Sequence, residues 1–228
     1  MSQRHVVPNN EPEDALKTAY LRLQIARDNL VKIDVNTAPL EELTTHTKEL
    51  QEAKKHFLEE VQRNLVEVNG HSILRHEYEA LQSLAKINGR DADALLHGIV
   101  AVKDGRITQL RIHFKGIKDI SPLTRIQRLE DLDLLGNQIE DISPLAGHHK
   151  LRCLRLWSNQ IEDIRSLSGL IGLKELWLNN NRLVDISTLQ GLPELSHVAL
   201  HENEALAEIA ANIETIRTLE EQGCTVYL

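Results

Sequence analysis

Histidine and cysteine are the side chains in this sequence best suited to metal binding or catalysis, and the chain contains 11 and 2 of them. His197 and His201 have the four-residue spacing with which two histidines on a helix chelate zinc. The repeat described below places them on a strand, where four residues span about 13 Å, whereas zinc holds nitrogen ligands at roughly 2 Å. We therefore predict no shared metal ion at this pair.

Neither cysteine has a recognisable catalytic partner in the sequence. Cys153 and Cys224 can form at most one bridge, so there is no disulfide framework, and nothing places a base beside either thiol. His148 and His149 stand where the repeat normally has an apolar residue, which we interpret as a locally loosened turn. The sequence has no phosphate-binding glycine loop, nucleophile elbow or zinc ribbon. We expect no catalytic residue, no cofactor and no metal, and hence no enzyme.

The composition is that of an ordinary globular protein. Of the 228 residues, 41% are hydrophobic and 26% are charged, and no apolar run approaches the roughly 18 residues of a membrane helix. The net charge of −8 argues against the basic footprint of a nucleic-acid-binding protein. The first residues lack the apolar stretch of a secretory signal, and cysteines are few, so we expect a cytoplasmic protein.

The elements that must position any functional residue are set by an internal repeat that begins at residue 107. Four blocks of 22 residues and a decaying fifth share the pattern L-x-x-L-x-L-x-x-N-x-I-x-D-I-x-x-L-x-x-L. In order, they read ITQLRIHFKGIKDISPLTRIQR, LEDLDLLGNQIEDISPLAGHHK, LRCLRLWSNQIEDIRSLSGLIG, LKELWLNNNRLVDISTLQGLPE and LSHVALHENEALAEIA. One block cannot bury its apolar face alone, so neighbouring blocks must stack.

This repeat resembles the leucine-rich repeat, in the short class found in bacterial internalins and in protein phosphatase regulatory subunits. The segment NQIEDISPL at 137–145 is especially internalin-like, and the resemblance extends over 107–206. It implies an α/β repeat fold, a right-handed solenoid with a parallel sheet on its concave side. In the family, such surfaces mediate adhesion, regulate phosphatases or act as scaffolds, so the resemblance implies a protein partner.

Alternation along each L-x-L segment decides which side chains are buried. Leu154 and Leu156 point into the stack, so Arg155 and Trp157 point away from it. Asparagine at the ninth position turns the chain, and its amide can bond backbone groups that the turn leaves unpaired. The predicted ladder consists of Asn137, Asn159, Asn181 and Asn203, whereas the first repeat has Lys115 at this position.

Helices and caps are expected on both sides of the repeats. Apolar positions at helical spacing predict an antiparallel pair of helices, the second with Thr37 as its N-cap and continuing to Val68, and then helices at 72–88 and 91–98. This pair either caps the solenoid or forms a separate interaction or dimerisation module. The expected organisation is a disordered N-terminus at 1–12, an α-helical domain at 13–98, a hairpin cap at 99–106, repeats at 107–206 and a helix–strand cap at 207–228.

The outward residues of the strands form the predicted binding face. Leu135, Trp157 and Trp177 are expected to make one apolar patch within a charged rim. The predicted partner-binding residues are Arg111, His113, Asp133, Leu135, Arg155, Trp157, Glu175, Trp177, Asn179 and His201. If the two indoles bind a partner, replacing both with alanine abolishes binding and leaves stability nearly unchanged. If they only pack on each other and on Arg155, stability falls instead.

We therefore predict a non-catalytic binding module or scaffold that recognises another protein, and neither nucleic acid nor a membrane. Two alternatives stay open from the sequence. One is a secreted bacterial effector that acts on host proteins, and the other is a structural homo-oligomer that associates through its N-terminal helices.

Overall fold

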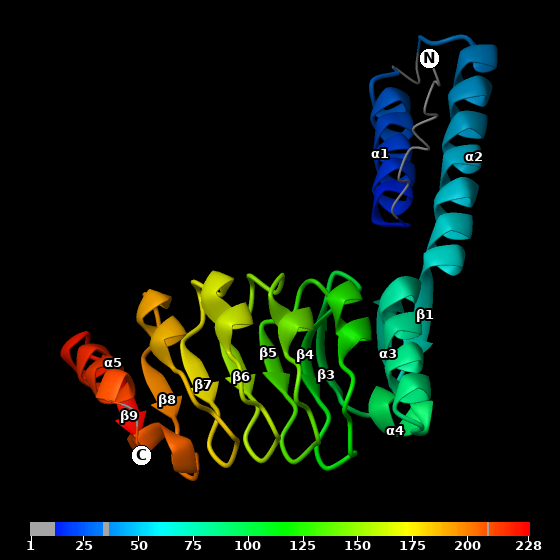
Figure 1. Ribbon diagram of the computed structural model, residues 1–228. Coiled ribbons are helices and arrows are strands. Elements are labelled where there is room, and N and C mark those ends of the chain that lie inside the picture. The colour runs from blue at the N-terminus through cyan, green and yellow to red at the C-terminus, as the bar shows by residue number, and fades with distance from the viewer. Residues whose placement is uncertain (1–11, 34–36, 209) are drawn as a thin grey trace, which may run out of the picture. The chain divides into compact units, whose positions relative to one another are not determined.

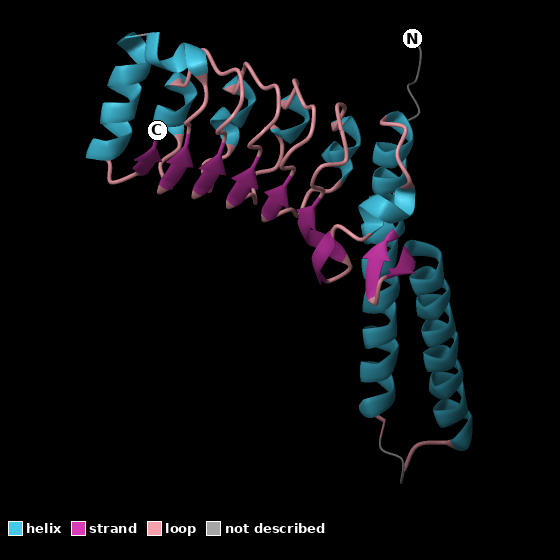
Figure 2. Cartoon of the chain, turned by 90° about the horizontal axis from the view of Figure 1, so that it is seen from below, coloured by secondary structure: helices cyan, strands magenta, loops and turns pink. Residues whose placement is uncertain are grey.

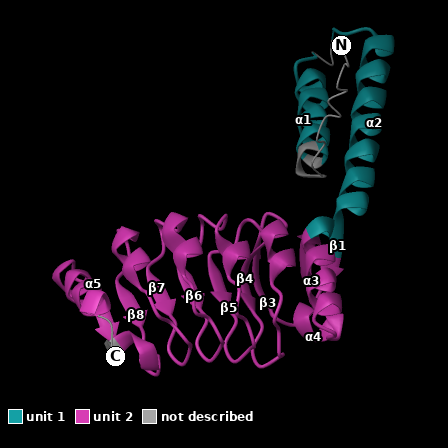
Figure 3. Ribbon diagram, viewed as in Figure 1, with its two compact units in different colours: residues 1–66, 74–76 teal, residues 67–73, 77–228 magenta. Residues whose placement is uncertain are grey.

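The computed structural model describes residues 12–33, 37–208 and 210–228, so the disorder expected at 1–11 lies outside the described residues. The chain divides into two compact units (Figure 3), Met1–Val66 with Leu74–His76 and Glu67–Ile73 with Glu77–Leu228. This division differs from the boundary expected at residue 98, because most of the short helices before the repeats belong to the second unit. Residue 12, expected to be disordered, begins the first helix.

The first unit is a pair of antiparallel helices (Figure 1), α1 (Pro12–Val31) and α2 (Leu40–Asn64). The rings of Tyr20 and Phe57 meet between them at a centroid distance of 5.8 Å. Two predicted helix ends were wrong. Pro39, not Thr37, precedes the first turn of α2, and α2 stops at Asn64 instead of continuing to Val68.

A tight turn explains the early end of α2. Asn69 and Gly70 both have positive φ, at 50° and 80°, as a two-residue turn between strands requires. The flanking residues form the strands β1 (Leu65–Val68) and β2 (His71–Leu74). Strands of four residues are too short to be distinguished from a helical seam in the sequence alone.

Polar side chains of α3 (Arg75–Ile87) and of the residue that follows it tie this helix to the first repeat, and the short helix α4 (Ala92–Leu96) comes next. The buried carboxylate of Glu77 accepts a hydrogen bond from the backbone N–H of Ile107 at 2.6 Å. The amide oxygen of Asn88 accepts the N–H groups of Lys118 and Asp119 at 2.7 and 3.0 Å. These bonds join residues about 30 positions apart, which sequence periodicity does not reveal.

The second unit contains a seven-stranded sheet in the order β3-β4-β5-β6-β7-β8-β9. The predicted hairpin is confirmed: β3 and β4 are antiparallel, and every later neighbour is parallel. The strands are β3 (Ile99–Lys103), β4 (Arg106–Arg111), β5 (Asp131–Asp133), β6 (Cys153–Arg155), β7 (Glu175–Trp177), β8 (His197–Ala199) and β9 (Thr225–Tyr227).

Short 3-10 helices return the chain on the side opposite the strands (Figure 2). Before four of these helices, an aspartate side chain accepts a hydrogen bond of 2.8 Å from the backbone N–H of the residue two positions later. These aspartates are Asp119, Asp141, Asp163 and Asp185. The five are η1 (Ser121–Arg125), η2 (Ser143–Leu145), η3 (Arg165–Gly169), η4 (Ser187–Gly191) and η5 (Glu204–Glu208), and α5 (Ala210–Glu221) follows. Leucines and isoleucines between the two sides are fully buried and form the core.

One core position carries a histidine. His148 stands where Ile126, Leu170 and Leu192 stand in the other repeats, and it is fully buried. Its Nε2–H donates to the carbonyl of Leu123 at 3.0 Å, whereas Nδ1 has no partner among the described residues. Burial lowers the pKa of His148, because protonation would place a charge in the core. The chain closes tightly around this residue, so the interpretation of a loosened turn was wrong.

Replacing His148 with leucine is expected to raise the free energy of unfolding by about 1 kcal/mol at neutral pH, and by more in mild acid. Because the folded-state pKa is lowered, the unfolded chain binds the proton more readily, and the wild type loses stability as the pH falls through about 6.5. Urea unfolding at several pH values measures the difference, and the exposed His149→Gln provides the control. Identical pH dependence in wild type and His148→Leu would contradict the prediction.

Candidate functional site

The sheet places two rows of side chains on its outer face, one residue from each strand in register. The first row is Gln109, Asp131, Cys153, Glu175, His197 and Thr225. The second row is Arg111, Asp133, Arg155, Trp177, Ala199 and Tyr227. The register predicted from the 22-residue repeat is therefore confirmed, and the last strand extends it by one further residue in each row.

The asparagine ladder holds these strands rigid at their ends. The amide oxygen of Asn137 accepts the N–H groups of Lys115 and Ile117, both at 3.1 Å, so the first repeat closes without an asparagine of its own. Its amide nitrogen donates to the carbonyls of Ile112 and Leu134 at 2.7 and 2.8 Å. Equivalent bonds are made by Asn159, Asn181 and Asn203.

The eighth residue of each repeat, which precedes an asparagine in four repeats and Lys115 in the first, bends the chain out of the strand. This position has a positive φ of 52° to 67° in all five repeats, in Phe114, Gly136, Ser158, Asn180 and Glu202. Four different side chains and one glycine share this backbone conformation, which is rare for residues other than glycine, because the ladder fixes it from both sides. The strand ends are thus preorganised, and so are the side chains beside them.

Trp177 belongs to an aromatic pair that the sequence did not reveal. Its indole stacks on the ring of Tyr227, with centroids 6.1 Å apart and planes inclined by 12°. The two residues lie two strands apart, and the small side chain of Ala199 separates them in the row. Trp177 is half-buried as a result, so it contributes to packing as well as to the surface. Alternation in CTVYL could have pointed to Tyr227, had the last strand been given a register.

Trp157 is different, because no other ring lies within stacking distance among the described residues. It is 37% exposed, and Leu135, its neighbour in the preceding repeat, is half-buried. Phe114 is the next exposed aromatic residue along this edge, and its ring covers Gly136, where an added Cβ would lie 2.3 Å from the ring. Trp157 is therefore an exposed aromatic side chain of this face that stacks on no other ring among the described residues.

The charged residues of the sheet face are largely paired with one another. A guanidinium nitrogen of Arg155 donates to Oδ1 of Asp131 at 2.8 Å, and a second lies 3.8 Å from Oε2 of Glu175. Nε2 of His113 lies 2.9 Å from Oδ2 of Asp133. Such pairs align the side chains across strands and reduce the charge available to a partner.

The ten predicted site residues all come from the sheet face, but they are not equally accessible. The structure leaves Arg111 and Trp157 exposed, and His113, Leu135, Arg155, Glu175, Trp177 and His201 half-buried. Asp133 and Asn179 are only 7% and 6% exposed, so neighbouring side chains cover these two and they are not accessible to a partner as predicted. Asp133 is buried because its Oδ1 accepts the N–H of Leu135 while Oδ2 faces His113.

The thiols and histidines of this region do not form a reactive centre in the described chain. Burial raises the pKa of Cys153 to about 12, and its Sγ–H lies 3.4 Å from a carboxylate oxygen of Glu175, so the thiolate is scarce at neutral pH. Burial also raises the pKa of Cys224. Within residues 12–33, 37–208 and 210–228, no three His, Cys, Asp or Glu residues lie close enough to hold a metal ion. Of the helices in the same residues, none has the length and apolar character to cross a bilayer.

Comparison with known proteins agrees with the repeat. Residues 149–191 match the family described as Leucine Rich repeats (2 copies). No curated protein matches the sequence. The chain is similar to an internalin (inlF) from Listeria monocytogenes, with 27% identity over 57% of this chain and 36% of that one, and a TM-score of 0.42.

Two further structures show similarity of the same order. Internalin C2 (inlC2) from Listeria monocytogenes has 23% identity over 56% of this chain and 74% of that one, with a TM-score of 0.41. The ectodomain of the receptor kinase GASSHO1/SCHENGEN3 from Arabidopsis thaliana has 27% identity over 56% of this chain and 18% of that one, with a TM-score of 0.47. The present chain spans 36% of the length of the first internalin.

Proposed function

The repeats are leucine-rich repeats, and we propose that their sheet binds another protein on its outer, concave face. Leucine-rich repeat domains generally serve as protein-binding modules, because their stacked repeats present an extended surface. The observation that carries the proposal is Trp157, an exposed indole with no aromatic partner among the described residues, in a sheet whose charges are largely paired with one another. Aromatic side chains surrounded by a polar rim commonly dominate the binding energy of an interface.

The rigidity of the face supports the same proposal. The ladder and the cross-strand ion pairs hold the side chains around Trp157 in place before any partner arrives. Little conformational entropy is then lost on binding. Arg111, exposed and without an ion pair among the described residues, offers the partner one free positive charge at the edge of this surface.

Trp157→Ala is expected to weaken partner binding at least about tenfold while the thermal midpoint changes by only about 2 °C. Affinity capture from native lysate identifies the partner, and titration of that purified protein by calorimetry gives the dissociation constants. Ile171→Ala is the matched control, because Ile171 is also a large exposed apolar residue but lies at the end of η3, away from the strands. Equal affinities for wild type and Trp157→Ala would contradict the proposal.

A second candidate function is self-association through α1 and α2. These helices expose large apolar side chains, including Leu21 at 55% and Ile25 at 52% on α1 and Leu58 on α2. Leu21 and Ile25 lie one helical turn apart on the same side of α1, and adjacent exposed apolar side chains favour a contact between chains.

The self-association candidate makes a separate prediction. The full chain is expected to be a dimer by multi-angle light scattering, and the Leu21→Glu/Ile25→Glu variant a monomer, because each introduced carboxylate would be buried at the contact. Val184→Glu, at an exposed apolar position in the fourth repeat, controls for the added charge. A monomeric wild type across the accessible concentration range would dismiss this candidate without affecting the first.

A cytoplasmic location is also part of the proposal, and it is supported by the two unbridged cysteines. The alternative of a secreted effector acting on host proteins predicts that the first 30 residues direct a reporter out of the cell. An export assay on that segment separates the two settings.

A further inference from the structure

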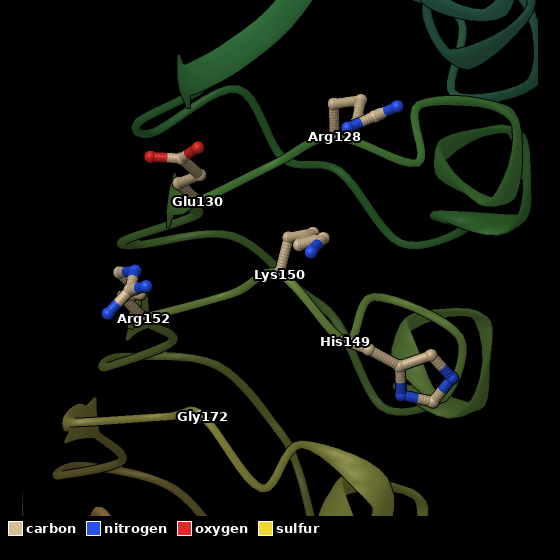
Figure 4. Close-up of a pocket in the computed structure, with 6 residues that line it drawn as sticks. All are labelled: Arg128, Glu130, His149, Lys150, Arg152 and Gly172. Carbon is tan, nitrogen blue, oxygen red and sulfur yellow. The ribbon is translucent and has the colours of Figure 1, made fainter.

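A shallow pocket lies on the flank of the repeats and not on the sheet face (Figure 4). The segments that precede the strands form it. Its volume is about 270 Å³, and three consecutive repeats contribute to it. The lining residues are Arg128, Glu130, His149, Lys150, Arg152 and Gly172.

Three of the lining residues are cations without an internal counter-ion. Arg128, Lys150 and Arg152 are exposed and make no side-chain hydrogen bond or ion pair within the described residues. The next repeat differs, because its cation at the same position has a counter-ion. Lys174, the counterpart of Arg152, lies with its Nζ 3.6 Å from a carboxylate oxygen of Glu194. In a chain with a net charge of −8, three adjacent unpaired cations form a local positive site.

The pocket is open because the third repeat has no side chain at a key position. Gly172 occupies the repeat position of Arg128 and Lys150, each 22 residues apart. A Cβ added at Gly172 would meet no atom closer than the carbonyl oxygen of His149 at 3.9 Å, and its φ is not positive. Backbone geometry therefore does not require glycine here, and a side chain at 172 would fill the pocket.

We propose that this pocket binds a phosphate monoester. Equivalent positions of adjacent repeats lie about 4.8 Å apart, so long side chains from neighbouring repeats can converge on one phosphate group. Arginine presents paired N–H groups that match phosphate oxygens, and lysine adds a point charge. A phosphate group near neutral pH concentrates about −1.5 to −2 charges at one point, which suits three cations grouped together.

Glu130 favours a single phosphate over a run of acidic residues. Glu130 holds the same repeat position as Arg152, one repeat earlier, and makes no ion pair among the described residues. Figure 4 shows it on the strand side of the pocket. An extended acidic segment or a nucleic acid backbone would bring further negative charge against this carboxylate. A lone phosphate avoids it and leaves Glu130 free to accept a hydrogen bond from a neighbouring hydroxyl or amide group.

The test uses the full chain and four small probes followed by amide NMR shifts. The probes are acetyl-Gly-phosphoserine-Gly-amide, its unphosphorylated form, the glutamate form and inorganic phosphate. We expect the phosphorylated peptide to shift the amide signals of His149 and Gly172, with at least about tenfold tighter binding than the unphosphorylated peptide. Added salt is expected to weaken the binding because the site is exposed.

Variants distinguish the pocket from general surface charge. Arg152→Glu and Gly172→Glu are each expected to weaken phosphopeptide binding at least about tenfold, the first by removing a donor and the second by placing a carboxylate in the pocket. Arg182→Glu, at an exposed arginine outside the lining of the pocket, is expected to change the affinity by less than about twofold. Thermal unfolding of each variant shows that the fold is retained.

The four probes separate the sources of phosphate. Tighter binding of the phosphopeptide than of inorganic phosphate assigns the site to a phosphorylated protein, and equal binding assigns it to a free phosphate compound. The proposal is overturned if no phosphate probe shifts the pocket signals, if the glutamate peptide binds as tightly as the phosphopeptide, or if the pocket variants bind like wild type.

Discussion

Replacing Asn137 with alanine is expected to lower the free energy of unfolding by about 3 to 4 kcal/mol. The side chain is buried and joins two repeats through two accepted and two donated hydrogen bonds of 2.7 to 3.1 Å. Alanine leaves these backbone groups in a dry environment, where each unpaired group costs about 1 to 3 kcal/mol. The loss is less than the sum because water can reach part of the turn.

Gln138→Ala is the control for this experiment, because Gln138 is the adjacent, exposed residue and its side chain makes no bond to the ladder. Its expected effect on the unfolding free energy lies within about 0.5 kcal/mol. Asn137→Asp keeps the accepting oxygen but loses both donated hydrogen bonds, and it also buries a carboxylate charge. Its loss of unfolding free energy is therefore expected to be at least as large as that of Asn137→Ala. Urea denaturation of the three variants measures the differences. A loss below about 1 kcal/mol for Asn137→Ala would show that the ladder does not hold the strand ends.

The sequence predicted most of the second unit because each repeat is a local unit copied at a fixed period. Alternation at Leu154 and Leu156 determined which strand residues are buried, and the period of 22 determined which residues are neighbours. The ladder of Asn137, Asn159, Asn181 and Asn203 followed from the same argument, but the closing of the first repeat did not. Its turn was in doubt because Lys115 replaces the asparagine, and Asn137 of the next repeat supplies the missing acceptor. Stacking requires every copy to have the same geometry, so the repeat pattern in the sequence determines which residues of neighbouring repeats are in contact.

The errors have a common physical origin, because each depends on contacts that no period encodes. The division of the chain depends on Glu77 and Asn88, which reach backbone groups of the first repeat about 30 residues away. His148 keeps the apolar position by bonding to a carbonyl that also accepts the N–H of Ile126. The repeat pattern describes the backbone at such positions, but not the polar partner that makes an unusual side chain acceptable.

The sequence also could not show which charged residues of the predicted binding face are available to a partner. A row of alternating signs, such as Arg111, Asp133 and Arg155, has the same appearance in the sequence whether the charges meet a partner or each other. In the structure, Arg155 turns toward Asp131 and Glu175, in the other row, and Asp133 faces His113. Only the distances between side chains on neighbouring strands separate internal pairing from recognition.

Trp177→Ala is expected to lower the free energy of unfolding by about 2 to 3 kcal/mol, unlike Trp157→Ala, whose expected cost is about 0.5 kcal/mol. The half-buried indole of Trp177 stacks on Tyr227 across the small side chain of Ala199, and alanine would leave a gap above the sheet. The stack also holds β9, the last strand, so amide exchange of Val226 and Tyr227 is expected to accelerate in this variant. The expectation that both tryptophans can be removed without loss of stability therefore applies to Trp157 alone.

A double-mutant cycle between Trp177 and Tyr227 tests the stack directly. A coupling of about 0.5 to 1.5 kcal/mol is expected for a packed aromatic pair, and Trp177→Phe, which retains a ring, is expected to recover at least half of the stability lost with alanine. The same proteins can be titrated with the captured partner. If Trp177→Ala were as stable as wild type and lost binding like Trp157→Ala, both indoles would belong to one recognition patch. The stacked geometry predicts the opposite division, in which Trp177 stabilises the last strand and Trp157 is left free to meet the partner.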